Sequence, residues 1–487
     1  MTSSLSRYAL VVAVGMIAVA AASGLKAETR GLEKVTAAAQ MARAAATLQM
    51  SEGYYRVPYA DGTKVKINRD HNSHTPRGRY DMVGTGGGPH KIVAAAPGKI
   101  MAIEDTFSER QDSSTADQCN NNYVWIAHPN SEWTKYSHMK KGSTTGKAKL
   151  TVGDNVKAGQ YLGDEGDVGC ASGSHLHFEV GDPQLSDPFT TVGGFLKDNA
   201  DSKRNRIARI CGLSDGRFDA GDTMTARAVP TMMSPGSKEV ARHGLPIGDY
   251  QCLFNQAVAA NYEPVFLNMF NVGSKVYVNA IFRPETPGSF QAFHGLTGAQ
   301  YQTQFEKWTG QGYRPVIVES YLDNGVRYAV VFKKQTGPAY VAYHGLSASE
   351  HQARVDDLTG AKGFRPVAVS VVSSGGRKYT ALYEKANVGG WQLKSQLTPA
   401  QYQQLYNSNK RAGRHVAYLN AYNHGGAPFI VAIWNAETPG GGKQRHGLSG
   451  AQYQEEWSSA LSVGMLTRAV TGYATGNNRT YAATWRK

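Results

Sequence analysis

The stretch GSHLHFEV, residues 173–180, places two histidines two positions apart and surrounds them with apolar residues. In a β-strand, residues i and i+2 lie on the same face. His175, His177 and Glu179 would therefore share one face, while the apolar residues between them would face a core. An HxH pair is a weak motif by itself, because a solvated strand face gives the same pattern. The rest of the chain has to decide between a functional site and a solvated face.

The first residues predict export. Arg7 precedes an apolar run over about residues 8–22, and small and then polar residues follow. This pattern is typical of a secretory signal peptide and is too short for a stable membrane span. We therefore expect residues 1–27 to be removed, with the cleavage position left open. No later segment is apolar enough to cross a membrane, so we expect a soluble monomer that is extracellular or periplasmic.

The net charge is strongly positive. The 487 residues include 52 Lys and Arg against 38 Asp and Glu, a formal charge of +14. No Lys/Arg-rich block stands out, which argues against a dedicated nucleic-acid arm. Anionic polymers of a cell envelope are the partners that this spread-out charge favours.

Four cysteines in an exported chain suggest two disulfides. Three pairings are possible. We favour Cys119–Cys170 and Cys211–Cys252, because each pair then lies within one region of the sequence.

The composition changes along the chain and predicts several domains. Residues 28–50 are Ala-rich and read as a helical lead-in. Residues 51–196 contain short β-like runs separated by Gly, Pro, Asp and Asn, which predicts a compact and mainly antiparallel β domain. Residues 197–240 are polar and irregular and read as a linker. The fold class we expect is a mainly-β domain followed by an α+β repeat domain.

Residues 241–487 repeat with a period of about 50. The signature leucines fall at intervals of 51, 50, 51 and 51, and each is followed by a helix-like stretch, a Pro-marked strand, a Gly turn and further strands. Such self-similarity predicts stacked or radially arranged units, and the sequence does not separate a closed ring from an open array. The five predicted repeats cover about 243–293, 294–343, 344–394, 395–445 and 446–487.

Four of these repeats carry the triplet HGL, and the fourth repeat departs from it with Ser395-Gln396-Leu397. One histidine per repeat could suggest a metal. We favour a repeat-defining packing or capping contact, since the fourth repeat does without the imidazole. The four histidines are His243, His294, His344 and His446.

The β domain holds half of the chain's 14 histidines. SHTPRGRYD contains His74 and Asp81, WTKYSHMKKG contains His138, and DVGCASGSHLHFEV contains the pair His175 and His177. In this order, and with LTVGDNVKAGQYLGDEG between the last two, the four segments together resemble the lysostaphin-like (LytM-type) zinc endopeptidases that cut peptidoglycan cross-bridges and stem peptides. The resemblance covers roughly residues 51–190.

This resemblance implies a zinc metallopeptidase domain over residues 51–196. It implies His74, Asp81 and His177 as zinc ligands and His138 and His175 as unligated catalytic histidines. Six residues separate the first ligand from Asp81, where many family members have three. His71 is therefore a rival first ligand, and we favour His74.

The implied chemistry is peptide hydrolysis. A bound zinc ion polarises the carbonyl and lowers the pKa of its water, and neutral imidazoles can accept the proton. The chain has no HExxH motif, so a histidine is the natural base. Glu179 could orient a histidine or could be merely solvated. His128 and His90 read as surface or turn residues.

The repeats resemble the tandem-repeat module that accompanies a serine-hydrolase domain in polyglycine hydrolases. The similarity lies in HGL-(S/T)-x-x-x-(Y/H)-Q and in the RPV strands beginning at Arg314 and Arg365. No serine-hydrolase motif is evident, so that activity does not carry over. We expect an exported peptidase on peptidoglycan, with repeats that position substrate or bind the envelope. The alternatives are a non-catalytic wall-binding or hydrolase-activating protein and an endopeptidase of Gly-rich proteins.

Overall fold

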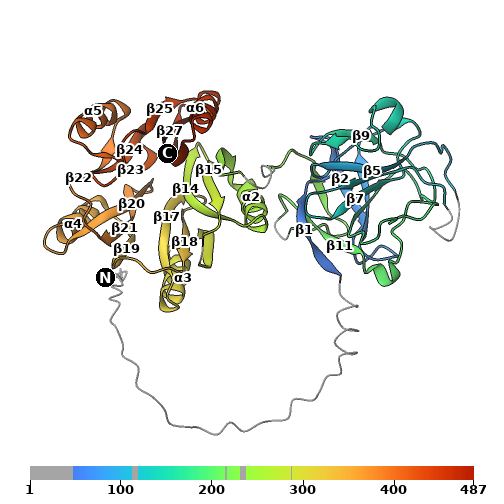
Figure 1. Ribbon diagram of the computed structural model, residues 1–487, viewed down its shortest axis with the longest axis horizontal. Helices are drawn as coiled ribbons and strands as arrows, with labels where there is room; N and C mark the ends of the chain where they lie inside the picture. The colour runs from blue at the N-terminus through green and yellow to red at the C-terminus, as the bar shows by residue number, and fades with distance from the viewer. Residues whose placement is uncertain (1–47, 112–118, 214–215, 231–236, 287) are drawn as a thin grey trace, which may run out of the picture. The chain divides into compact units, whose positions relative to one another are not determined.

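The computed structural model places the described residues in two compact units, one ending at residue 230 and the other beginning at residue 237 (Figure 1). The predicted signal peptide, residues 1–27, lies outside the described residues, as does most of the predicted helical lead-in. None of the helices in the described ranges has the length and hydropathy needed to cross a membrane. The described ranges are 48–111, 119–213, 216–230, 237–286 and 288–487.

The first unit is built on one ten-stranded sheet and a two-stranded sheet. The order of the main path is β12-β2-β3-β10-β7-β6-β5-β8; β11 also pairs with β10, and β1 pairs with β11. Its elements are β1 (Gln49–Tyr55), β2 (Lys64–Arg69), β3 (Arg79–Thr85), β4 (Lys91–Val93), β5 (Gly98–Glu104), β6 (Tyr123–Ala127), β7 (Trp133–Ser137), the short π-helix η2 (Ser143–Lys147), β8 (Asn155–Val156), β9 (Tyr161–Asp164), β10 (Leu176–Gly181), the 3₁₀ turn η3 (Ala200–Ser202), β11 (Asn205–Ile210) and β12 (Thr223–Thr225).

Strand β10 lies in the middle of this sheet and carries Leu176 to Val180 of the GSHLHFEV segment. It pairs antiparallel with β3 on one side and with β7 on the other. Leu176, Phe178 and Val180 are fully buried in the main core, which confirms their predicted face. The opposite face is buried as well, because His177 and Glu179 are 5% and 0% exposed. The reading of that face as a solvated one is therefore wrong.

Two sequence predictions at the edges of this unit need correction. Residues 197–240, predicted as a linker, contain β11 and β12, and β11 pairs with both β1 and β10. Gln49 begins β1, so the predicted helical lead-in, residues 28–50, ends in a strand. The reason is the same in both cases. The pair β1–β11 joins segments about 150 residues apart and is parallel, so no local pattern announces it.

The disulfide Cys119–Cys170 is present, with its Cα atoms 5.5 Å apart. No free cysteine occurs in the described part of the chain, which includes all four cysteines. The pairing Cys211–Cys252 stays a prediction.

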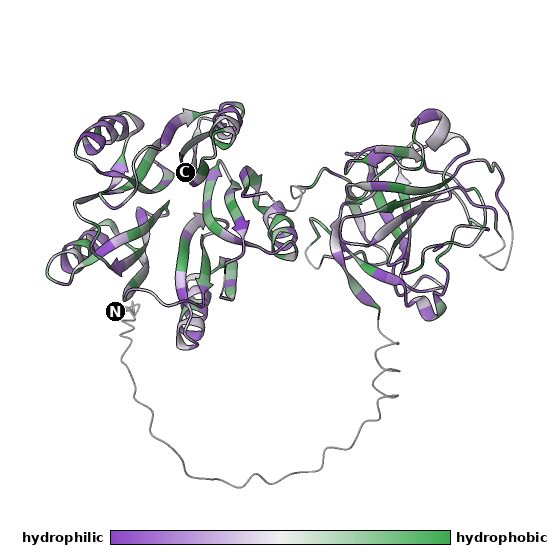
Figure 2. Cartoon of the chain, viewed as in Figure 1, coloured by the Kyte–Doolittle hydropathy of each residue, from purple (hydrophilic) through white to green (hydrophobic). Residues whose placement is uncertain are grey.

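The second unit consists of five repeats, each with an outer strand, a helix, an inner strand and a middle strand in a three-stranded sheet. Hydropathy in Figure 2 shows helices α4 and α5 as mainly hydrophilic, while the strands carry most of the hydrophobic colour. The elements are β13 (Val240–Pro246), α2 (Ile247–Ala259), β14 (Tyr262–Val272), β15 (Lys275–Pro284), β16 (Phe290–Leu296), α3 (Gly298–Gly310), β17 (Arg314–Leu322), β18 (Val326–Lys333), β19 (Tyr340–Leu346), α4 (Ala348–Thr359), β20 (Phe364–Ser373), β21 (Arg377–Lys385), β22 (Trp391–Leu397), α5 (Pro399–Arg411), β23 (His415–His424), β24 (Ala427–Asn435), β25 (Lys443–Leu448), α6 (Gly450–Ser462), β26 (Leu466–Thr475) and β27 (Asn478–Arg486).

Local sequence explains where the helices of the repeats begin and where their inner strands bulge. Helices α3 to α6 all begin with a capping box, in which a Ser or Thr and the Gln or Glu three residues later bond each other's backbone N–H. In the inner strands, Pro315 and Pro366 coincide with register shifts against the middle strand. A proline removes one ladder hydrogen bond, so a bulge is where a strand tolerates it.

The repeats form a closed ring, which answers the question that the sequence left open. The inner strands β14, β17, β20, β23 and β26 contact one another in turn, and β26 returns to β14. The closure is held by hydrogen bonds between the first and last repeats. Buried Glu239 accepts from the backbone N–H and the hydroxyl of Thr467, and Gly472 N donates to Asn268 Oδ1 at 3.0 Å.

A polar hub occupies the centre of this ring. Each inner strand contributes one buried polar residue at the equivalent position, and four of the five accept a backbone N–H from a neighbouring inner strand. Such side chains lock neighbouring repeats together without an apolar core at the axis. The hub residues are Asn268, Glu319, Ser370, Asn420 and Thr471, each no more than 1% exposed.

The HGL histidines are packing contacts between repeats, as expected. In four of the five interfaces the imidazole lies against a tyrosine of the preceding helix. One of these four is the ring closure, where the histidine of the first repeat contacts the helix of the last. The pairs are His294 with Tyr250, His344 with Tyr301, His446 with Tyr402 and His243 with Tyr453, with ring centroids 5.2, 4.9, 5.6 and 4.3 Å apart.

Candidate active site

Three neighbouring strands bring the predicted site residues together. Asp81 on β3 and His177 on β10 are directly opposite each other in register. His138 follows the last residue of β7, and His175 precedes the first residue of β10. His74 comes from the loop between β2 and β3. All five residues of the sequence-based prediction therefore lie at one end of the central strands.

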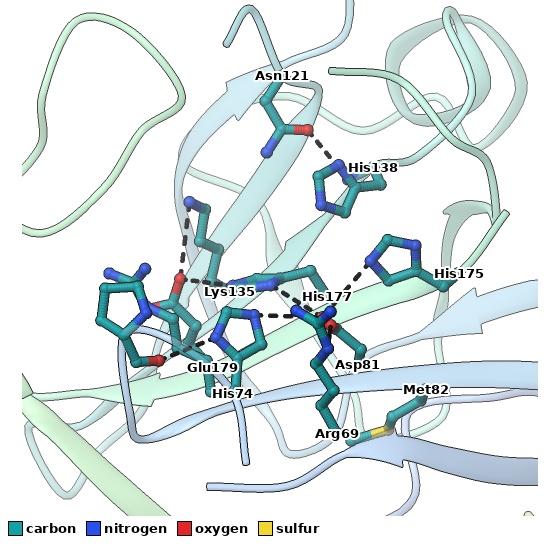
Figure 3. Close-up of polar contacts among 12 residues, drawn as sticks. Arg69, His74, Asp81, Met82, Asn121, Lys135, His138, His175, His177 and Glu179 are labelled. Atoms are coloured by element: carbon teal, nitrogen blue, oxygen red, sulfur yellow. Dashed lines mark hydrogen bonds and ion pairs between the residues drawn. The ribbon is translucent and has the colours of Figure 1, made fainter. Parts of the chain in front are cut away.

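The side chains converge on one oxygen of Asp81 (Figure 3). His177 Nδ1 lies 3.2 Å from Asp81 Oδ1, while His74 Nε2 and His175 Nε2 each lie 3.5 Å from it. Burial raises the pKa of Asp81, but its interactions with the three neighbouring imidazoles outweigh it and hold that pKa well below its ordinary value. The carboxylate is therefore ionised and acts as the negative centre of the cluster.

Hydrogen bonds on the far side of each ring fix which nitrogen faces this centre. His74 Nδ1 donates to Pro76 O at 2.9 Å, and His175 Nδ1 donates to Gly173 O at 2.8 Å. A carbonyl oxygen can only accept, so Nδ1 carries the hydrogen in both rings. Nε2 is then the nitrogen turned toward Asp81. His177 has the opposite orientation, with Nδ1 inward.

His138 stands beside the cluster rather than in it. Its ring centroid lies 4.7 Å from that of His175 and 5.7 Å from that of His177. Nδ1 donates to Val168 O at 2.7 Å, and the backbone N–H donates to Asn121 Oδ1 at 3.1 Å. Burial, together with the neighbouring imidazoles, lowers the pKa of His138 well below its ordinary value. Its Nε2 therefore carries a lone pair.

A buried cluster of charged residues around Glu179 contacts His177 on the side of its ring that faces away from Asp81. His177 Nε2 bonds Glu179 Oε1 at 2.9 Å, and Asn205 Nδ2 donates to Glu179 Oε2 at 2.9 Å. Arg79 and Lys135 are the cross-strand neighbours of Glu179, at 3.4 and 3.8 Å. Burial raises the pKa of Glu179, but these two cations bring it well below its ordinary value. An ionised Glu179 fixes the hydrogen of His177 on Nε2 and leaves Nδ1 for the centre.

The other histidines of the unit lie outside the cluster. His71, the rival of His74, is buried against Tyr80, and its Nε2 contacts Asn72. His128 was expected to be a surface or turn residue, and it lies at the turn between β6 and β7, where its carbonyl accepts from Ser131 N at 3.1 Å. Its side chain is nevertheless only 7% exposed and bonds Pro97 O and Thr134 Oγ1, because the turn folds back onto the sheet. His90 is half-buried.

A cavity of about 220 Å³ opens onto these groups. Its walls include the disulfide Cys119–Cys170, and Phe195 and Arg69 also contribute. Arg69 has a half-exposed side chain whose Nε lies 3.9 Å from Asp81 Oδ2. The bridge therefore ties the loop before β6 to the loop before β10 at the edge of the cavity.

The arrangement fits a metal ion. The inward atoms of His74, Asp81 and His177 all lie within 4.8 Å of one another. Two imidazole nitrogens and a carboxylate oxygen are donors that Zn²⁺ prefers, and three protein ligands are the usual number in catalytic zinc sites. Two further imidazoles stand beside these donors. Together they define the candidate centre of a metal-dependent hydrolase.

Comparison with known families agrees with this class. Residues 80–188 match the model of peptidase family M23. The model described as a polyglycine hydrolase-like structural repeat (BTRD1) matches five times, and these matches make up just over half of the chain. The chain therefore belongs to the proteins with polyglycine hydrolase-like repeats, and its first unit is a peptidase family M23 domain. The matched repeats are residues 236–285, 287–335, 337–386, 388–437 and 440–487.

Two curated proteins are similar to part of this chain. The peptidoglycan DD-endopeptidase ShyC of Vibrio cholerae is 38% identical over 87 residues, which is 18% of each chain. An uncharacterized metalloprotease of Buchnera aphidicola is 41% identical over 59 residues, which is 12% of this chain and 14% of that one. The chain spans less than a fifth of the length of either relative.

Two solved structures illustrate the structural comparison. The catalytic domain of lysostaphin from Staphylococcus simulans has 24% identity and a TM-score of 0.17, covering 28% of this chain and 81% of that one. The M23 metalloprotease pseudoalterin has 18% identity and a TM-score of 0.20, covering 37% and 98%. These low scores add nothing to the fold described above.

Some residues around the site were not predicted. Lys135, Arg79 and Asn205 hold Glu179, and Asn121 holds His138. Period 2 in WTKYS does place Lys135 on the face of Ser137, next to His138, so this signal was present. Asn205 lies in the segment predicted as a linker, and nothing local points to it.

Proposed function

We propose that the chain is an exported zinc endopeptidase that hydrolyses peptide bonds of bacterial peptidoglycan. In this proposal His74, Asp81 and His177 hold the ion, and His138 and His175 are the catalytic histidines. The observation that carries it is the convergence of the three donor atoms within 4.8 Å, with the two further imidazoles beside them. The M23 family match and the similarity to the peptidoglycan DD-endopeptidase of Vibrio cholerae support peptidoglycan as the substrate.

The bound ion would supply a polarised carbonyl and a water of lowered pKa. The chain's own residues do the rest. Nδ1–H of His138 and of His175 is committed to a backbone carbonyl, so proton exchange takes place at Nε2. One such nitrogen accepts the proton of the attacking water. Once protonated, it donates to the developing oxyanion or to the leaving amine.

Positioning falls to the groups around these imidazoles. Val168 O holds the ring of His138, and Asn121 Oδ1 holds its backbone. Glu179 orients His177 through Nε2. The half-exposed guanidinium of Arg69 at the cavity is placed to meet a carboxylate of the substrate.

The test is made on the chain without its first 27 residues. We expect about one zinc per chain by elemental mass spectrometry, and release of muropeptides from purified peptidoglycan. His138→Ala should keep the zinc and lose at least about a hundredfold in rate, which is typical for loss of a general base. His177→Ala should lose both the zinc and the hydrolytic activity. His71→Ala is the matched control for His74→Ala and should retain zinc. Full activity of His138→Ala would refute the proposed mechanism.

We further propose that the repeats bind the envelope or position the substrate. The net charge of +14 favours anionic envelope polymers as partners. Cosedimentation with peptidoglycan sacculi should be stronger for the complete chain than for residues 28–230. If both sediment equally, the repeats have no such role.

A further inference from the structure

The interface between the third and fourth repeats differs from the other four. Ser395 stands where the other repeats have the HGL histidine, and His351 stands where the other helices have a tyrosine. The imidazole of His351 instead stacks on Tyr379 within its own repeat, with centroids 4.4 Å apart and planes 9° apart. No HGL imidazole from the fourth repeat therefore fills the space between α4 and β22.

A groove of about 460 Å³ occupies this place. Helix α4 lines it with His351, Gln352 and Val355, and the whole of β22, residues 391–397, lines the opposite side. Its volume lies in the range of sites that hold small ligands. Because the sheet order is β22-β24-β23, β22 is the edge strand that faces it.

A histidine–glutamine hydrogen bond that spans other interfaces has no counterpart here. Gln352 Nε2 instead donates to Asp356 Oδ1 within α4 at 2.8 Å, and Gln396 Nε2 donates to the hydroxyl of Tyr379 at 3.1 Å. In two intact interfaces the HGL histidine bonds a helix glutamine through Nε2, namely His294 with Gln251 at 2.9 Å and His446 with Gln403 at 2.8 Å. Gln352 occupies the same helix position and has Ser395 opposite it, which offers no imidazole.

His351 adds an unsatisfied nitrogen to this groove. Its side chain is buried, at 4% exposure, and its Nδ1 lies 3.4 Å from the hydroxyl of Tyr383. Nε2 is buried without any hydrogen-bond partner. The hydroxyls of Tyr301 and Tyr453, at the equivalent position of other helices, are unpartnered as well. What distinguishes His351 is that its unpartnered nitrogen belongs to a residue that lines an open groove, where a ligand atom or an ordered water can satisfy it.

The lining is mainly neutral and amide-rich. Amide and hydroxyl groups come from Gln352, Gln392, Gln396 and Ser395. Lys394 adds one cation, and no carboxylate belongs to the groove. Trp391 is half-buried and contributes an aromatic surface, whose negative face attracts polarised C–H groups. Neutral donors and acceptors beside an indole suit a ligand with many hydroxyl groups and apolar ring faces.

We propose that this groove is a saccharide-binding site. A peptide added to the edge of β22 would be the main competitor, but it would need apolar pockets for alternate side chains. Apart from the indole of Trp391, only Val355 and the β22 leucines offer apolar surface. Under the proposed function the saccharide is the glycan strand of peptidoglycan, and this narrower statement rests on that function.

The test measures binding without hydrolysis. The chain without its first 27 residues, carrying His177→Ala, is titrated by calorimetry with peptide-free glycan strands, an N-acetylglucosamine tetramer and a free stem peptide. The double variant His351→Tyr/Ser395→His recreates the ring pair of the other interfaces and should fill the groove. We expect saccharide affinity to fall at least tenfold in this variant and in Gln352→Ala.

Gln454→Ala changes the equivalent glutamine of the last repeat and should bind as the unmodified groove does. Circular dichroism establishes that each variant is folded. The proposal is overturned if no saccharide binds, if the refilled groove binds equally well, or if the stem peptide alone binds there. Because the background variant has no hydrolytic role, these results are independent of the test of the peptidase.

Discussion

Glu319 at the centre of the repeat ring predicts a pH-dependent stability. Its carboxyl group is fully buried, and no Lys or Arg contacts it among the described residues. Oε1 accepts hydrogen bonds from Asn268 Nδ2, from the backbone N–H of Met269 and from Asn420 Nδ2. Burial raises the pKa of Glu319 from its ordinary value of 4.5 to about 8, despite these donors. The folded ring therefore holds a proton that the unfolded chain releases.

The sign and size of the pH dependence follow from the difference in the pKa of Glu319 between the folded and unfolded states. Between about pH 4.5 and pH 8, only the folded state keeps the proton, so the free energy of unfolding falls as pH rises. The contribution is complete below pH 4.5 and lost above pH 8. One pKa unit corresponds to about 1.36 kcal/mol, so the loss approaches about 5 kcal/mol. Glu319→Gln mimics the protonated acid and should remove this dependence.

The expected result is a variant that matches the unmodified ring near pH 4.5 and exceeds its stability by several kcal/mol near pH 8.5. Pulse proteolysis in urea, with fragments assigned by mass spectrometry, reports on the second unit separately from the first. Glu306→Gln, an exposed change on α3, is the matched control and should leave the pH dependence intact. Equal pH profiles for Glu319→Gln and the unmodified chain would refute the argument.

Three further changes probe other parts of the molecule. Cys170→Ser opens a bridge that spans 51 residues, and should lower the stability of the first unit by about 4 kcal/mol; an unchanged melting temperature would contradict this. Gly472→Ala places a Cβ 2.3 Å from the ring of Phe270 at the closure, and should cost the second unit about 1–3 kcal/mol by urea unfolding. Glu179→Gln should weaken zinc binding about 10–100-fold in competition with a chelating dye, and an unaltered affinity would remove Glu179 from its orienting role.

The site was predictable where local pattern and register coincide. Alternation in GSHLHFEV gives the buried face of β10, and antiparallel pairing then places His177 opposite Asp81. His74 could be only favoured over His71, because a loop rather than a strand positions it. The alternation places Glu179 on the face of the histidines, but it does not show whether the carboxylate is buried or solvated, since its burial depends on cations from two other strands.

The fold was less predictable where partners are far apart in sequence. The period of about 50 announces the repeats, but ring closure depends on contacts such as Glu239 with Thr467, 228 residues away. Likewise, β11 reads as irregular because its hydrogen-bonding partner β1 lies about 150 residues earlier. Local sequence describes the unit of an array and says little about how its two ends meet.

The closed ring limits how the number of repeats can change during evolution. An open array gains or loses one unit at a time, and its exposed ends need special terminal units. Here the first and last repeats bury each other, so no repeat is terminal and none has to be a cap. A duplicated or deleted repeat would not lengthen or shorten the unit but would break the ring open. Diversity therefore has to arise within individual interfaces, as it has between the third and fourth repeats.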